Sequence, residues 1–420
     1  MPRLAILEYV VGPDTTHVLL IKQGFDQPLI FEARDERGGV PRRMLELCAA
    51  RLLIDFHGLP GDWDLEPNPA LREALGLTPA VPAAKRNKAV LERNLAIPGF
   101  HYEMDYWTGL GSRLFPAPLR PHLEDCEVLL VIPHGPLHAL PFAALRWGEN
   151  QYLVERFGLA HAPSLSVLRQ CRARSARRTR GGSSAPQSAL AAAIAAANDT
   201  NPATFEADAE RLAEICRTES PATRVVRMTG PKPEDGRLPA SKTGIVEEAP
   251  AHELIHFACH GVFGGDQSFD PLDSGLLFSD GEKALSLADA AAMTPQARHR
   301  WILSARDIFA LRLRADLVTL RACSSGRSAR QSGDELVGLT RAVLYAGAAS
   351  LIVSLWNVNQ KSSQLLLSAF YETWLKPEPA DGCGAVAKWK ALQQAQIELL
   401  RHGYAHPFHF APFILVGDWA

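Results

Sequence analysis

Two apolar segments of the chain each end in a side chain that can take part in nucleophilic catalysis. Residues 255–261 read Ile-His-Phe-Ala-Cys-His-Gly, and residues 317–326 read Leu-Val-Thr-Leu-Arg-Ala-Cys-Ser-Ser-Gly. A cysteine is a strong nucleophile only as thiolate, and a nearby imidazole can accept its proton. If both segments are strands of one parallel sheet, His260 and Cys323 face each other at its carboxyl edge. The backbone N–H groups of Gly261 and Cys323 could then form an oxyanion hole, because glycine permits close backbone approach.

The pattern of apolar residues predicts the sheet that would position these groups. From residue 127 onward, short apolar runs typical of buried strands alternate with segments of helical periodicity. The predicted strands are 128–132, 190–197, 224–228, 253–258, 317–322, 350–355 and 413–416. The predicted helices are 206–216, 242–248, 335–346, 362–375 and 386–400. This alternation predicts an α/β fold with a mostly parallel sheet covered by helices on both faces.

The first hundred residues have a different pattern. Residues 4–10 and 17–21 are apolar runs separated by a Gly-Pro-Asp turn signal, which predicts a β-hairpin, and residues 42–56 have helical spacing. We therefore expect a β-hairpin and helical N-terminal region at 1–101 and a second domain at 102–420. The arginine-rich stretch from Arg172 to Arg180 runs into Gly-Gly-Ser-Ser, which favours a solvated loop.

Composition excludes several classes of protein. The chain has 420 residues, 47% of them hydrophobic, and a formal net charge of −2, so there is no electrostatic reason to expect a nucleic-acid partner. Its longest apolar run is too short to span a membrane, and no signal peptide is visible. Seven scattered cysteines without a CxxC pair argue against both a disulfide framework and structural zinc. We expect a cytoplasmic protein.

Several ordered segments together resemble the CHAT family of caspase-like cysteine peptidases, which are relatives of separase. The two strand ends, HFACHG and LRACSSG, carry the resemblance most directly. Further matching segments are VIPHGPLH at 131–138, LPFAAL at 140–145, APSLS at 162–166, AGA at 346–348, SLWNV at 354–358 and APFILVGDW at 411–419. The resemblance runs from about residue 102 to the C-terminus and implies a caspase-like fold.

The resemblance also implies an activity. His260 would be the general base and then the general acid of peptide-bond hydrolysis, and Cys323 would form the acyl-enzyme, with no metal or organic cofactor. His256 is expected to be a hydrogen-bonded core histidine. The partners implied are a protein substrate and an activating partner or sensor protein, in a bacterial defence or cell-death pathway.

Substrate choice is predicted from three further positions. The residue two before the nucleophile can reach the pocket for the P1 side chain in caspase-like folds, and here it is Arg321. Trp356 and Asn357 lie in a segment where separase-like sequences carry acidic residues. An arginine without a carboxylate would favour an acidic P1 residue. The alternative is that Arg321 pairs with an internal carboxylate, such as Asp334 or Glu335.

Two other functions stay open at this point. The same fold could serve as a catalytically silent binding scaffold, although both residues of the dyad are present. A different enzyme could use Cys323 in another way, for instance as a hydrolase or transferase, and small-ester hydrolysis without peptide cleavage would indicate it.

Overall fold

A computed structural model describes residues 2–57, 109–148, 151–179, 185–199, 202–233, 237–262, 270–324, 332–377 and 385–420. The chain divides into two compact units. Unit 1 comprises residues 1–161 and 327–333, and unit 2 comprises residues 162–326 and 334–420. The domain boundary predicted between residues 101 and 102 lies outside the described residues.

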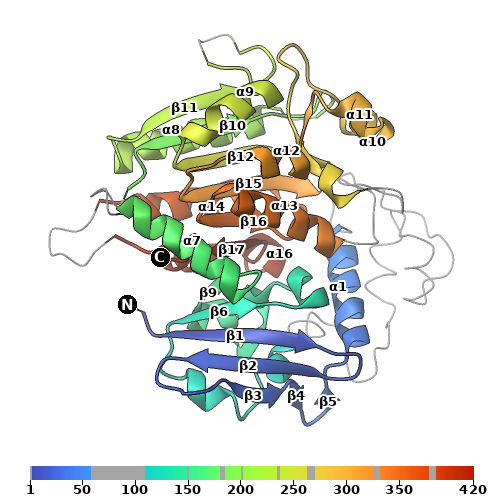
Figure 1. Cartoon of the computed structure of the whole chain (residues 1–420), viewed down its shortest axis with the longest axis vertical. Coiled ribbons are helices and arrows are strands. Elements are labelled where there is room, and N and C mark those ends of the chain that lie inside the picture. The colour runs from blue at the N-terminus through green and yellow to red at the C-terminus, as the bar shows by residue number, and fades with distance from the viewer. Residues whose placement is uncertain are drawn as a thin grey trace. The chain divides into compact units, whose positions relative to one another are not determined.

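Unit 1 is built on a small mixed sheet. Its strands, in sheet order, are β9 (Gly158–His161), β6 (Val128–Ile132), β1 (Leu4–Val11), β2 (Thr16–Lys22) and β3 (Leu29–Glu32). β1 pairs antiparallel with β2, which confirms the predicted hairpin, and parallel with β6 (Figure 1). Alternate residues of β1 are buried, as expected for a strand with one face on the core. The α-helices in the described part of this unit are α1 (Arg42–His57), α5 (Gly111–Leu114) and α6 (Leu153–Arg156).

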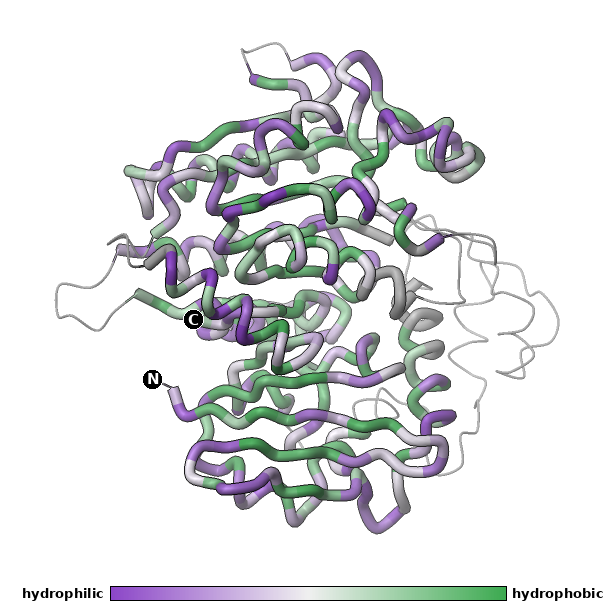
Figure 2. The backbone as a smooth tube through the Cα atoms, viewed as in Figure 1, coloured by the Kyte–Doolittle hydropathy of each residue, from purple (hydrophilic) through white to green (hydrophobic). Residues whose placement is uncertain are grey.

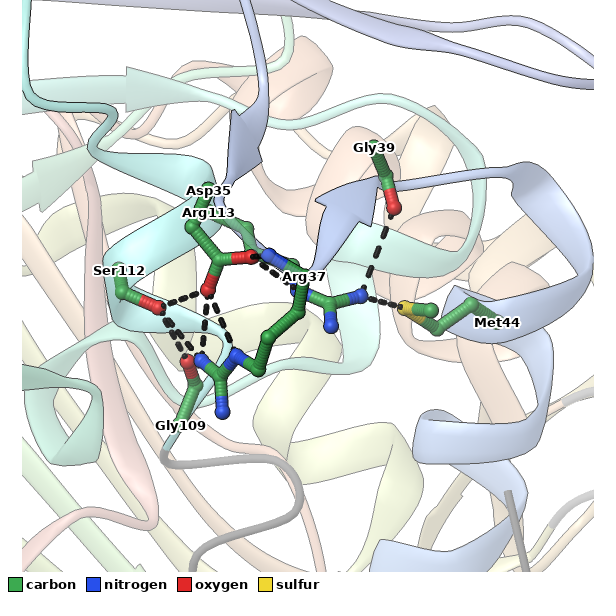
Figure 3. A network of polar contacts seen from close by, with 7 residues as sticks. All are labelled: Asp35, Arg37, Gly39, Met44, Gly109, Ser112 and Arg113. Atoms are coloured by element: carbon green, nitrogen blue, oxygen red, sulfur yellow. Dashed lines mark hydrogen bonds and ion pairs between the residues drawn. The ribbon is translucent and has the colours of Figure 1, made fainter. Parts of the chain in front are cut away.

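An ion pair joins two segments of unit 1 that are far apart in the sequence (Figure 3). Arg113 of α5 is 2% exposed, and its Nε lies 3.2 Å from Oδ1 of Asp35, the last residue of β4 (Arg34–Asp35). Arg37 Nη2 and Ser112 Oγ donate to Asp35 Oδ2 over 2.6 and 2.8 Å. Burial alone would raise the pKa of Asp35, but these hydrogen bonds and the charge of Arg113 outweigh it and hold the pKa below its ordinary value.

Unit 2 contains the larger sheet. Its main strands, in sheet order, are β11 (Arg224–Thr229), β10 (Ser188–Ala193), β12 (Leu254–Val262), β15 (Leu317–Ser324), β16 (Ser350–Ser354) and β17 (Phe413–Gly417). All neighbours are parallel except β16 and β17. The end of β12 also pairs with β13 (Gly275–Leu277), which pairs with β14 (Ile302–Ser304). Each strand predicted beyond residue 127 is present, and the mostly parallel sheet is confirmed.

Helices cover both faces of this sheet. The helices of unit 2 are α7 (Leu165–Thr179), α8 (Ala203–Glu219), α9 (Lys242–Glu248), α10 (Leu287–Ala292), α11 (Pro295–Arg298), α12 (Ala305–Ala310), α13 (Ser332–Ala346), α14 (Gln360–Trp374), α15 (Lys388–Arg401) and α16 (Pro407–Phe410). One face of β12 and β15 packs into an apolar core with α7, α9, α12 and α13. The opposite face, reached by α8 and α14, carries the polar residues described below.

The loop predicted for the arginine-rich stretch is wrong for the residues that the structure describes there. Residues 165–179 form helix α7, and Figure 2 shows hydrophilic residues recurring along it. Leu168 and Cys171 point into the protein, whereas Arg169, Arg172 and Arg177 are exposed. Arginine is a good helix former, so a helix with one apolar stripe tolerates many arginines on its outer face.

No helix among the described residues is long and apolar enough to cross a membrane.

Candidate functional site

The backbone brings His260 and Cys323 to neighbouring positions at the carboxyl ends of two adjacent strands. His260 in β12 is the register partner of Cys323 in β15, and the two strands are parallel. Neighbouring strands lie about 4.8 Å apart, and register partners in parallel strands occupy the same face of the sheet. The juxtaposition expected from the sequence is therefore present in the backbone.

The imidazole of His260 is held on one side. Its Nε2 lies 2.8 Å from Oδ2 of Asp199, and the ring centroid lies 4.8 Å from that of Phe205 in α8. His260 is only 8% exposed. Within the described part of the chain, its Nδ1 has no hydrogen-bond partner. When Asp199 accepts the proton of Nε2, the lone pair of Nδ1 remains available to act as a base.

Asp199 was missed by the sequence reasoning. It follows β10, the strand next to β12, and its Oδ2 accepts a hydrogen bond of 2.7 Å from the Ala196 N–H. Burial alone would raise its pKa, but the hydrogen bond from His260, the charge of that ring and the Ala196 N–H together keep the pKa below its ordinary value. The sequence did carry one signal for it: Asp199 is an acidic residue just after the strand predicted at 190–197, which was expected to end at the same carboxyl edge of the sheet.

Arg321 is buried rather than exposed to a cleft. Its side chain is 2% exposed, and Nη1 lies 2.6 Å from Oδ2 of Asp208, whose side chain is 4% exposed. The guanidinium lies over the ring of Phe205, 5.4 Å from the centroid. Burial raises the pKa of Asp208 to about 6, against the opposing charge of Arg321. The geometry matches pairing with an internal carboxylate, which is that of Asp208.

His256 is a hydrogen-bonded core histidine, as expected. Its Nδ1 lies 3.0 Å from the hydroxyl of Tyr371 in α14, which donates to Thr319 Oγ1 over 2.7 Å. Burial, and to a lesser extent the charge of Arg321, lowers the pKa of His256 to about 3, so the ring is neutral at physiological pH.

The other predicted site residues lie near the same edge of unit 2. Gly261 is the register partner of Ser324 in β15 and of Leu276 in β13. Trp356 and Asn357 follow β16 and are buried, and Trp356 Nε1 donates to the Phe408 carbonyl over 3.3 Å. The oxyanion role of Gly261 and Cys323 and the substrate contacts of Trp356 and Asn357 remain predictions.

Five other cysteines are buried, and burial raises the thiol pKa of three of them so far that they are poor nucleophiles. They are Cys48, Cys126, Cys171, Cys216 and Cys259. Burial raises the pKa of Cys48 and Cys216 to about 12 and that of Cys171 to about 11. No group of three or more metal-ligating side chains is found among the described residues.

The chain is similar to known proteins in sequence. The family model for the CHAT domain matches residues 105–418. Tetratricopeptide repeat protein 28 of Homo sapiens and that of Mus musculus are each 28% identical to the chain over 316 residues. That alignment covers 69% of this chain and 12% of each relative, so the chain spans about an eighth of their length.

A solved structure shares the fold. The Saccharomyces cerevisiae separase–securin complex includes a chain that matches 99% of this one with a TM-score of 0.51 and 11% identity, over 30% of its own length. This match shows similarity of fold, and the caspase-like architecture predicted from the sequence is confirmed. Because the family model covers well over half of the sequence, the chain belongs to the CHAT-domain family.

Proposed function

We propose that this protein is a cysteine endopeptidase in which Cys323 is the nucleophile and His260 the general base. The observation that carries the proposal is the register of β12 and β15, which sets the two residues side by side at one sheet edge. The orientation of the imidazole supports it, because Asp199 engages Nε2 and leaves Nδ1 for the thiol.

The proposed reaction follows from these roles. His260 Nδ1 takes the proton of Cys323, and the thiolate attacks the carbonyl carbon of the scissile peptide bond. The N–H groups of Gly261 and Cys323 stabilise the oxyanion. The imidazolium gives its proton to the leaving amine, and water then hydrolyses the thioester with His260 again as base. Asp199 stabilises the imidazolium at each step through its carboxylate.

The substrate is proposed to be a protein, cleaved at selected sites and only after activation by a partner. Two comparisons support a protein partner: the solved separase structure is a complex with securin, and the curated relatives are named for tetratricopeptide repeats. We place the activity in a bacterial defence or cell-death pathway, as the sequence resemblance implies.

The first test is co-expression of the chain with its neighbouring gene products, followed by intact-mass analysis. Wild type is compared with Cys323→Ala and with the matched control Cys259→Ala, which removes a buried thiol of β12. Cleavage that is lost in Cys323→Ala and kept in Cys259→Ala supports the proposal. Cleavage that persists in Cys323→Ala contradicts it, because the reaction then has another nucleophile.

A second test needs no substrate. Iodoacetamide alkylates thiolates, so peptide mapping should show Cys323 reacting faster than the five buried cysteines, and His260→Ala should abolish that advantage. If Cys323 is not reactive, and wild type and Cys323→Ala bind a partner with equal affinity, the protein is instead a binding scaffold.

A further inference from the structure

Helix α8 contacts both strands that carry the proposed dyad. Phe205 and Asp208 are three positions apart in this helix and therefore lie on one helical face. Phe205 packs against the ring of His260 in β12, and Asp208 pairs with Arg321 in β15. The guanidinium of Arg321 also lies over Phe205, so the four side chains form one contiguous cluster.

The place of the ion pair in the strand is informative. Alternation along a strand puts positions 321 and 323 on the same face, so Arg321 anchors β15 just before the proposed nucleophile. Both partners are almost completely buried. A buried ion pair stabilises a fold little, if at all, compared with well-packed apolar side chains of the same volume. We therefore explain this pair by the position in which it holds β15 relative to α8.

We infer that Asp208 and Arg321 are a positioning pair, which holds the end of β15 against α8 and, through Phe205, sets the orientation of the His260 ring. The inference rests on the proposed function and deepens it. It also concerns specificity. The charge of Arg321 is neutralised within the fold, so the residue that selects P1 is not Arg321, and cleavage does not depend on an acidic P1 side chain.

The same helix offers a matched control. Glu210 of α8 pairs with Arg227 of β11 at 2.6 Å. Both side chains are more than a third exposed, and β11 is the edge strand of the sheet rather than a strand of the proposed dyad. Asp208→Asn and Glu210→Gln each remove one negative charge from one helix without changing side-chain size. The readout is the rate at which iodoacetamide alkylates Cys323 at pH 7, with circular dichroism to verify folding.

We expect Asp208→Asn to slow alkylation of Cys323 by about 10- to 100-fold, since misplacement by about 1 Å has effects of this size. Glu210→Gln should stay within about twofold of wild type, as exposed pairs contribute little. Equal rates for the two variants would overturn the inference. If these two rates are equal but His260→Ala still slows alkylation of Cys323, only the positioning role is wrong and the proposed function stands. If wild-type Cys323 reacts no faster than the buried thiols, the proposed function itself is wrong.

A double variant covers the case in which Asp208→Asn does not fold. Asp208→Leu combined with Arg321→Met replaces the pair by apolar side chains of similar size, which preserves folding in comparable buried pairs. A folded double variant with slow alkylation of Cys323 supports a positioning role. A folded double variant with the wild-type rate shows that the pair serves only the fold.

Substrate profiling gives an independent test of the specificity claim. A peptide library cleaved by wild-type protein should show no preference for Asp or Glu at P1 that depends on Arg321. If wild type prefers an acidic P1 residue and Arg321→Met loses that preference, Arg321 contacts the substrate and the inference is wrong.

Discussion

Replacing Asp199 by asparagine should disable the base without moving it. The carboxylate accepts the Nε2 proton of His260 over 2.8 Å, whereas a carboxamide can donate to Nε2 and stabilise the tautomer that carries its proton on Nδ1. A hydrogen bond to a charged group contributes about 1.5–3 kcal/mol. A free-energy change of about 1.4 kcal/mol corresponds to a factor of ten. Loss of this hydrogen bond alone should therefore lower the fraction of protein with a Cys323 thiolate and a His260 imidazolium by about 10- to 150-fold. The wrong tautomer increases the loss, as in Ser-His-Asp triads, where the same change costs about 10⁴ in kcat.

The assay is the rate of Cys323 alkylation by iodoacetamide between pH 5 and 9. Because the pKa of Asp199 lies below its ordinary value, the wild-type carboxylate is ionised throughout this range. The deficit of Asp199→Asn should therefore be full from pH 5 to about 7 and shrink towards pH 9, where a thiol with an ordinary pKa of about 8.5 ionises without a base. Asp307→Asn is the control, since Asp307 is a half-buried carboxylate with a lowered pKa that pairs with Lys242 instead. If Cys323 of Asp199→Asn is alkylated within about threefold of the wild-type rate, Asp199 does not orient His260 as proposed.

Two buried groups predict opposite pH dependences of stability. Asp208 has a pKa of about 6 in the folded chain, above its ordinary value, so its contribution to the free energy of unfolding should fall by about 3 kcal/mol as pH rises from 4 to 6. His256 has a folded pKa of about 3, so its contribution is present above about pH 6.5 and falls by up to about 5 kcal/mol as pH drops to 3. Urea denaturation of Asp208→Asn and His256→Gln should remove one dependence each, and unchanged curves would contradict both assignments. In unit 1, Arg113→Met should lower the free energy of unfolding by about 2 kcal/mol, because the half-buried Asp35 carboxylate loses its fully buried cationic partner. The exposed Arg43→Met should cost less than about 1 kcal/mol, and an equal loss in both variants would show that burial of the pair is unimportant.

The strands were predictable because a buried parallel strand leaves a compact apolar run. Residues 128–132 were predicted as a strand and form β6, and the run at 317–322 lies within β15. Short strands with weak runs were missed, such as β9 at residues 158–161 and β13 at 275–277. Their pairing depends on neighbouring strands more than on their own composition.

The site was predictable only in part, since a sequence shows reactive side chains more readily than their partners. His260 and Cys323 each follow an apolar run, and that spacing predicted their juxtaposition. Asp199 follows an alanine-rich strand in a polar segment that reads as an ordinary loop. The pairing of Asp208 with Arg321 joins a helix to a strand more than a hundred residues away, and no local pattern encodes such a contact.

Asp199 follows β10, and His260 and Cys323 lie in β12 and β15; these three strands stand next to one another in the same order as along the chain. During synthesis from the N-terminus, the orienting acid and the base therefore emerge before the sulfur does. Until β15 docks beside β12, the proposed base has no thiol next to it. The order of the strands thus delays the proposed reaction until β10, β12 and β15 have all formed.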